Sequence, residues 1–136
     1  MKPANILLSD NFDVKITDFG LASTTGKTNE FCGTLTFMAP EIWYGSYLAS
    51  SADIFALGVI LFYMFSGRYP FRFANMHDPR YDMIIEKKFD DFWRSFGSEV
   101  NFPTPFKDLL NHMLANNPND RLTIQQIRDH SWAKGK

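Results

Sequence analysis

Two oxygen-bearing side chains and a lysine lie near the start of the chain at a spacing that suits phosphate chemistry. Asn5 and Asp18 flank two short apolar runs that predict a β-hairpin, so both side chains would meet at its open end. An amide oxygen and a carboxylate suit Mg²⁺, a hard cation that takes its other ligands from water and phosphates. Lys2 would add positive charge where a transferring phosphoryl group develops negative charge. The pattern therefore predicts a magnesium and phosphate site.

The elements that would position these groups are a hairpin and a long loop. Residues 5–8 and 14–17 are apolar runs joined by the turn-forming tripeptide of residues 9–11. Residues 18–41 contain glycines, threonines and polar residues without a sustained period, which predicts a loop. A loop of that length in a compact domain is usually functional.

The rest of the chain predicts helices. Residues 53–65 are apolar on every side, which indicates a helix buried on all faces, with Ser50 and Ser51 as N-caps and Gly67 as its end. A membrane span needs about 20 apolar residues, so none is expected here. Further helices are predicted at 79–87, 104–115 and 123–130, with a turn at 116–120. The fold class is mainly α with a short β-hairpin.

The composition narrows the class of protein. A chain of 136 residues with a net charge of −1 holds at most one domain and carries no basic footprint for nucleic acid or for a membrane surface. The single cysteine, Cys32, excludes an internal disulfide framework, and no secretory signal precedes Lys2. We therefore expect an intracellular, cytoplasmic protein. The three histidines show no metal-ligand spacing with Cys32.

Three short strings occur in a fixed order: Lys2-Pro-Ala-Asn5, Asp18-Phe-Gly20 and Ala39-Pro-Glu41. Each is weak alone, but together they resemble the protein-kinase signature set. The resemblance covers nearly the whole chain, and the position of Lys2 is typical of serine/threonine kinases. The string from Arg68 to Phe71 favours the calmodulin-dependent or energy-sensing branch.

By this resemblance, residues 1–136 are part of a protein kinase domain, namely the C-terminal lobe of its α+β fold. Residues 1–5 would end the catalytic loop, and residues 18–20 would form the metal-binding loop. The activation segment would run over 18–41, and a helical subdomain over 42–133. The implied cofactors are ATP and Mg²⁺, and the implied reaction transfers the γ-phosphate of ATP to Ser or Thr of protein substrates.

The resemblance also assigns roles to single residues. Lys2 would contact the γ-phosphate, and Asn5 and Asp18 would hold the magnesium ions. Thr34 would act with Lys2 and hydrogen-bond toward it and toward the catalytic aspartate. The nucleotide would also meet Thr17, beside Asp18. The floor beneath its adenine ring would consist of Ile6, Leu7 and Leu8, faced by Ile60 and Met64.

Further matches concern residues that would hold the site in place and take no part in the chemistry. Glu41 would form a buried ion pair with Arg121, although two unrelated surface charges remain an alternative. Asp53 would hydrogen-bond the catalytic-loop backbone. Glu30 stands where many relatives carry a phosphothreonine, so its charge would partly order the activation segment or would merely be solvated. Alternative phosphorylation sites are Thr24, Thr25 and Thr28.

Several family parts do not occur in residues 1–136: the glycine-rich loop, its phosphate-pairing lysine and the His-Arg-Asp triplet, whose aspartate would lie just before Met1. We therefore expect this chain alone to be nearly inactive and to bind nucleotide poorly. The helix at 53–65 would expose an apolar face for a partner, or leave the chain partly molten. The alternative function is a non-catalytic, kinase-like interaction or scaffold protein. Coding sequence in frame upstream of Met1 would favour the kinase.

Overall fold

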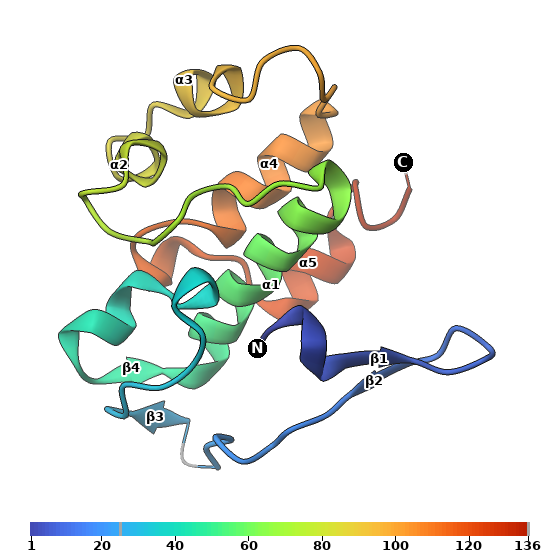
Figure 1. The fold of residues 1–136 in the computed structure, drawn as a ribbon, viewed down its shortest axis with the longest axis vertical. Helices are drawn as coiled ribbons and strands as arrows, with labels where there is room; N and C mark the ends of the chain where they lie inside the picture. Colours follow the sequence, from blue (N-terminus) through green and yellow to red (C-terminus); the bar gives the residue numbers. More distant parts are fainter. Residues whose placement is uncertain (25, 136) are drawn as a thin grey trace.

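The computed structural model describes residues 1–24 and 26–135, which form a helical body with two small antiparallel sheets (Figure 1). The predicted fold class is therefore confirmed. Thr25, one of the predicted phosphorylation sites, and Lys136 lie outside the described residues. The helices are α1 (Ala49–Ser66), α2 (Pro79–Ile85), α3 (Phe89–Arg94), α4 (Thr104–Met113) and α5 (Ile124–Asp129). The strands are β1 (Ile6–Leu8), β2 (Val14–Ile16), β3 (Lys27–Thr28) and β4 (Tyr47–Leu48).

The predicted hairpin is confirmed as the antiparallel pair β1 and β2, with Ile6 opposite Ile16 and Leu8 opposite Val14. At its closed end, the Ser9 hydroxyl accepts a hydrogen bond from the Asp13 N–H at 3.0 Å. At its open end, the Thr17 N–H donates to the Asn5 carbonyl at 2.9 Å. The pairing therefore places Asn5 beside the residues that follow β2.

The segment predicted as a loop over 18–41 contains short elements. The strand β3 pairs with β4 next to the start of α1 (Figure 1), and single 3₁₀ turns form at Leu35–Phe37 and Pro40–Tyr44. The prediction of a segment without secondary structure was wrong here, because elements this short leave no periodicity in a sequence. The Ala49 N–H also donates to the Gly26 carbonyl at 2.9 Å, which fastens the segment to α1.

The long apolar helix begins earlier than predicted. Helix α1 starts at Ala49 directly after β4, and its N-cap is Leu48, whose side chain makes no capping hydrogen bond. The predicted N-caps Ser50 and Ser51 therefore lie in the first turn. The tertiary pairing of β4 sets this start, which local sequence does not reveal. The predicted end is confirmed, because Gly67 adopts the left-handed region with φ of 70°.

Burial along α1 is uneven. Phe55, Val59 and Phe62 are fully buried, whereas Tyr63 and Phe65 are exposed and Met64 is 74% exposed. The prediction that the helix is buried on every face was therefore wrong for its last turn. At 18 residues the helix is also long and apolar enough to cross a membrane by length and composition alone, so length does not exclude a span. Its burial against the aromatic core is typical of the central helix of a folded domain.

Helix α4 packs against α1 and closes the core (Figure 1). Its buried face carries the predicted periodic residues Phe106, Leu109, Leu110 and Met113. Close approach occurs at Gly58 of α1, where an added Cβ would lie 2.9 Å from Cδ2 of Leu114 and 3.0 Å from Cβ of Met113. Gly58 therefore allows the two helices to come together.

Replacement of Gly58 by Ala should destabilise the chain. Alanine favours the helix by about 1 kcal/mol, but overpacking a core of this kind costs about 1–3 kcal/mol. Because one of the contacts is to a Cβ, which cannot rotate away, we expect the melting temperature to fall. Ser50→Ala, an exposed change in the first turn of the same helix, is the control and should leave it nearly unchanged. A Gly58→Ala chain that melts at or above the wild-type temperature would contradict this account.

Candidate active site

Five of the predicted site residues line one cleft at the open end of the hairpin. The cleft has a volume of about 350 Å³ and contains Lys2, Asn5, Thr17, Asp18 and Thr34. Its remaining lining comes from the first residue, from β2, from the segment after β2 and from α1. These residues are Met1, Ile16, Phe19, Leu21, Ala22, Gly33 and Asp53. The chain thus brings together polar groups that are up to 51 positions apart, from Lys2 to Asp53 (53 − 2).

Asn5 and Asp18 meet directly in this cleft. The Asn5 Nδ2 donates to Asp18 Oδ2 at 3.4 Å, and the Thr17 hydroxyl donates to the Asn5 carbonyl at 3.4 Å. Asp18 has φ of 62°, a left-handed conformation that few residues other than glycine adopt. Such backbone conformations cluster at functional sites. The predicted convergence of Asn5 and Asp18 is therefore present.

The donor set fits a magnesium ion. Because the Asn5 Nδ2 faces Asp18, the Asn5 Oδ1 and the carboxylate are the two oxygen donors of the pair. Asp18 is exposed, so water and phosphate oxygens can reach it. Mg²⁺ usually takes one or two protein carboxylates and fills its shell with water and phosphates. Over residues 1–24 and 26–135, no three acidic, histidine or cysteine side chains gather into a metal cage, so phosphate would have to complete the shell.

Thr34 lies in the cleft without the predicted bond to Lys2. Its carbonyl accepts from the Phe37 N–H at 2.9 Å, and its side chain does not cap the turn that follows. Among the described residues, no hydrogen bond joins the Thr34 hydroxyl to the Lys2 ammonium group. The structure therefore supports proximity of the two residues and not the predicted contact.

The predicted adenine floor is not assembled. None of Ile6, Leu7 and Leu8 lines the cleft, and Leu7 and Leu8 are exposed. Successive side chains of a strand point to opposite faces, so three neighbours on β1 cannot form one floor. On α1, Ile60 and Met64 are four residues apart and lie on one face of the helix, but Ile60 is buried in the core while Met64 is exposed. Ile6, Leu7 and Leu8 therefore do not form one continuous surface in this structure, and their contact with a nucleotide stays a prediction.

Asp53 joins the first residues to helix α1. Its Oδ1 lies 3.5 Å from the amino nitrogen of Met1, in agreement with the predicted contact to the catalytic-loop backbone. Sequence reasoning gave Asp53 only a supporting role, yet it also lines the cleft. The signal in the sequence is an acidic residue at the start of the otherwise apolar run of residues 53–65.

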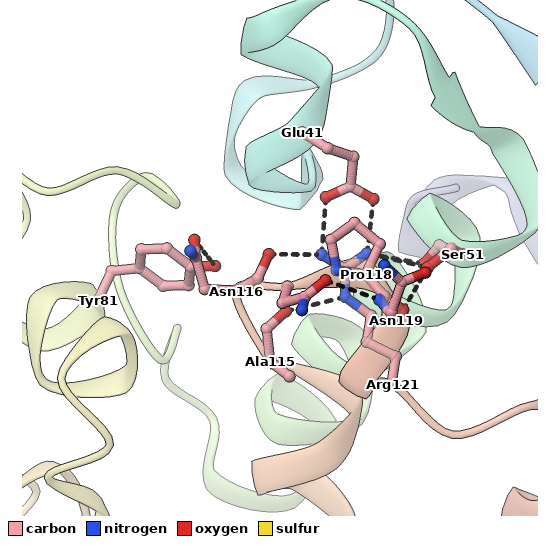
Figure 2. Close-up of polar contacts among 9 residues, drawn as sticks. Glu41, Ser51, Tyr81, Ala115, Asn116, Pro118, Asn119 and Arg121 are labelled. Carbon is pink, nitrogen blue, oxygen red and sulfur yellow. Dashed lines mark hydrogen bonds and ion pairs between the residues drawn. The ribbon is translucent and has the colours of Figure 1, made fainter.

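The buried ion pair at the far end of the segment is confirmed. Arg121 donates from Nη1 and Nη2 to the two Glu41 carboxylate oxygens, each at 2.7 Å (Figure 2). Arg121 is 7% exposed, so the alternative of two unrelated surface charges is wrong. Its remaining donors reach the backbone, with Nε at 2.9 Å from the Ala115 carbonyl and Nη1 at 3.0 Å from the Ser51 carbonyl. The guanidinium also lies over the Phe55 ring, 4.9 Å from its centroid.

A second buried polar contact lies close to this pair. The Tyr81 hydroxyl donates to Asn116 Oδ1 at 3.3 Å (Figure 2). Burial raises the pKa of Tyr81 well above its ordinary value, although the positive charge of Arg121 opposes that shift. The phenol therefore stays protonated and serves as a donor at any physiological pH.

Comparison with known proteins decides the family. The model of the protein kinase domain matches residues 1–133. The chain belongs to the protein kinase domain family. The three sequence strings are thus family motifs, and the structure gathers the two that carry Lys2, Asn5 and Asp18 into one cleft. Protein kinases generally use ATP with Mg²⁺, in agreement with the oxygen donors found here.

The similar proteins are named serine/threonine kinases. The chain is 37% identical over 147 residues to serine/threonine-protein kinase PKH1 of Saccharomyces cerevisiae, covering 96% of this chain and 18% of that protein. It is 35% identical over 141 residues to CBL-interacting serine/threonine-protein kinase 12 of Arabidopsis thaliana, covering 98% of this chain and 27% of the relative. The probable serine/threonine-protein kinase MARK-C of Dictyostelium discoideum is 35% identical over 136 residues. The match covers 97% of this chain and 17% of that protein. The chain thus spans less than a third of each relative's length.

Proposed function

We propose that this chain carries the magnesium- and substrate-binding part of an ATP-dependent serine/threonine protein kinase. The observation that carries the proposal is the meeting of Lys2, Asn5, Asp18 and Thr34 in one cleft. The names of the similar proteins support serine and threonine as the residues that would accept the phosphate. The reaction would move the γ-phosphate of ATP to a hydroxyl of a protein substrate.

Each cleft residue has a distinct part in this proposal. Asn5 and Asp18 would hold the magnesium ion, which when bound neutralises charge on the phosphates. The hydrogen bond from Asn5 to Asp18 keeps the carboxylate and the amide oxygen close together before any ligand arrives. Lys2 would place its positive charge against the transferring phosphoryl group. Thr34, on the activation segment, would help position the hydroxyl-bearing substrate.

The family's usual proton acceptor, the aspartate of the His-Arg-Asp triplet, is not among residues 1–136. Residues 1–136 contain neither a His-Arg-Asp triplet nor a glycine-rich loop. We propose that these groups must be supplied from outside residues 1–136, because positioning of the nucleophile and of the nucleotide depends on them. We therefore expect residues 1–136 alone to transfer no measurable phosphate.

A non-catalytic interaction role is the second candidate, and one observation favours it. Large apolar side chains are exposed on the hairpin and on the end of α1, including Leu8 at 63%, Val14 at 62% and Met64 at 74%. Where such groups form a contiguous patch, they mark interaction surfaces. Under this alternative the surface would bind a partner protein and no phosphate would move. The free, half-buried Cys32 suits an intracellular setting for either function.

A chimera tests the proposed function. The upstream part of the PKH1 kinase domain, ending at the catalytic aspartate of the family motif, is joined to Met1 of this chain. Transfer of radiolabelled γ-phosphate to a degenerate library of serine and threonine peptides is then measured with and without Mg²⁺. We expect magnesium-dependent transfer. A chimera that melts cooperatively but transfers nothing, while the parent PKH1 domain is active, would favour the interaction role.

A further inference from the structure

We propose that Tyr47 is a positioning residue that holds the activation segment beside the cleft through the backbone of Glu30. We call the hydrogen bond from the Tyr47 hydroxyl to the Glu30 carbonyl the latch. Its effect on phosphate transfer rests on the function proposed above, whereas the latch itself does not. The latch joins the side chain of Tyr47, on strand β4 of Figure 1, to the Glu30 carbonyl in the part of the segment that leads to Thr34. In this arrangement a neutral phenol orders the segment, and the charge of Glu30 does not.

The Tyr47 side chain is well placed to act as a fixed point. Its ring is buried, with 8% of the residue exposed, and its position on β4 pairs with Thr28 on β3. The hydroxyl donates to the Glu30 carbonyl at 2.9 Å. Because the ring is packed and the strand is paired, the hydroxyl has little freedom to follow the segment if the segment moves.

The backbone of Glu30 is held on both sides. Its carbonyl accepts from Tyr47, and its N–H donates to the Thr28 hydroxyl at 3.2 Å. The Glu30 side chain is exposed, and within residues 1–24 and 26–135 its carboxylate has no ion pair or hydrogen bond. The order of this stretch therefore comes from contacts to its main chain. The prediction that the Glu30 charge orders the segment is the alternative to this hydrogen bond, and Glu30→Gln distinguishes the two.

The phenol remains a donor over the whole physiological range. Burial, followed by the contact with Cys32 and the negative charge of Glu30, raises the pKa of Tyr47 to about 12. A group that keeps its proton below that pH donates the same hydrogen bond at pH 6 and at pH 9. The latch is thus insensitive to pH in this range and differs from one built on a phosphate, whose second pKa is about 6.

The latch lies a few residues from the cleft and borders an open cavity. Cys32 Sγ lies 3.9 Å from the Tyr47 hydroxyl, and Gly33, with φ of 114°, leads into Thr34. A cavity of about 730 Å³ lies behind the segment and is lined by Glu30, Cys32, Thr34 and Tyr47 among others. Beside this open space, the segment is held by the β3–β4 pairing, by the edge contact of Phe31 with the Trp43 ring at 5.1 Å, and by these hydrogen bonds.

The reactivity of Cys32, which is the single cysteine of the chain, reports the latch when it is read together with amide exchange. Loss of the contact between Sγ and the Tyr47 hydroxyl alone would change labelling and leave exchange over residues 26–34 unchanged. Loss of the Tyr47 hydroxyl in Tyr47→Phe should release the stretch and raise the rate of Cys32 alkylation by iodoacetamide about fivefold, the factor equivalent to one hydrogen bond of ~1 kcal/mol. Tyr44→Phe is the matched control, because Tyr44 is 82% exposed in the same region. Amide hydrogen exchange over residues 26–34 should accelerate in parallel in Tyr47→Phe only.

Two further variants separate the phenol from the charge and from misfolding. Glu30→Gln keeps the backbone and removes the carboxylate, so labelling should stay at the wild-type rate. Thr28→Val removes the acceptor of the Glu30 N–H and should raise the rate without touching Tyr47. Equal rates in wild type and Tyr47→Phe would overturn the proposal, and so would acceleration by Tyr44→Phe or by Glu30→Gln.

The positioning role has its own measurement in the PKH1 chimera. Tyr47→Phe should raise KM for the peptide about fivefold and leave KM for ATP unchanged, because the segment faces the protein substrate. A merely structural role would lower the melting temperature and alter both constants together. If the chimera is inactive but Cys32 labelling still responds to Tyr47→Phe, the proposed kinase function fails and the latch stands. If the chimera is active and labelling does not respond, the latch fails alone.

Discussion

Replacing Arg121 by Met should unfold the chain under conditions where the wild type is folded. Removal of the guanidinium leaves the Glu41 carboxylate in a site where its side chain is only 12% exposed, without a partner for its charge. Breaking a buried pair in this way costs about 3–5 kcal/mol. The change also frees the Ala115 and Ser51 carbonyls and removes the contact over Phe55. A domain with a total stability of about 5–15 kcal/mol keeps little after such a loss.

Urea denaturation followed by tryptophan fluorescence measures this effect. The control is Arg68→Met, which breaks the exposed pair with Glu99 and should cost no more than about 1 kcal/mol. A double change of Glu41→Leu and Arg121→Met should recover much of the stability, because no charge is then buried alone. If Arg121→Met and Arg68→Met shift the urea midpoint equally, the ion pair contributes no more than a surface contact.

The features that the sequence predicts well are those with local signals. The hairpin follows from two apolar runs around Ser9, Asp10 and Asn11, and the end of α1 follows from Gly67, which takes the left-handed conformation. Because the hairpin is local, the meeting of Asn5 and Asp18 at its open end is also predictable. The pairing of Glu41 with Arg121 spans 80 positions, and only the family resemblance indicates it.

The features that the sequence misses depend on contacts between distant segments. The two-residue strands β3 and β4 carry no period, and their pairing moves the start of α1 to Ala49. The contact between the Tyr47 hydroxyl and the Glu30 carbonyl joins a side chain to a backbone group, so no residue pattern signals it. The idea of one continuous adenine floor meets a different difficulty. Three apolar neighbours were treated as one surface, although a strand turns alternate side chains to opposite faces.

In the PKH1 chimera, Asp18→Asn should lower kcat by about 10²–10³, the loss typical when one preorganised electrostatic group is removed from an active site. Asparagine keeps the shape of the side chain and one oxygen but removes the negative charge that a divalent cation prefers. Asp10→Asn is the matched control, since Asp10 is an exposed carboxylate in the hairpin turn and lies outside the cleft. That variant should transfer phosphate at the rate of the unchanged chimera.

Two features make the Asp18 result specific to the metal. Asparagine tolerates the left-handed conformation that Asp18 adopts, so the variant should melt at the temperature of the unchanged chimera. A site weakened in metal binding should also recover part of its activity as Mg²⁺ is raised, whereas a misfolded site should not. Retention of activity within threefold would mean that the Asp18 carboxylate holds no essential cation, and that the cleft serves another purpose than phosphate transfer.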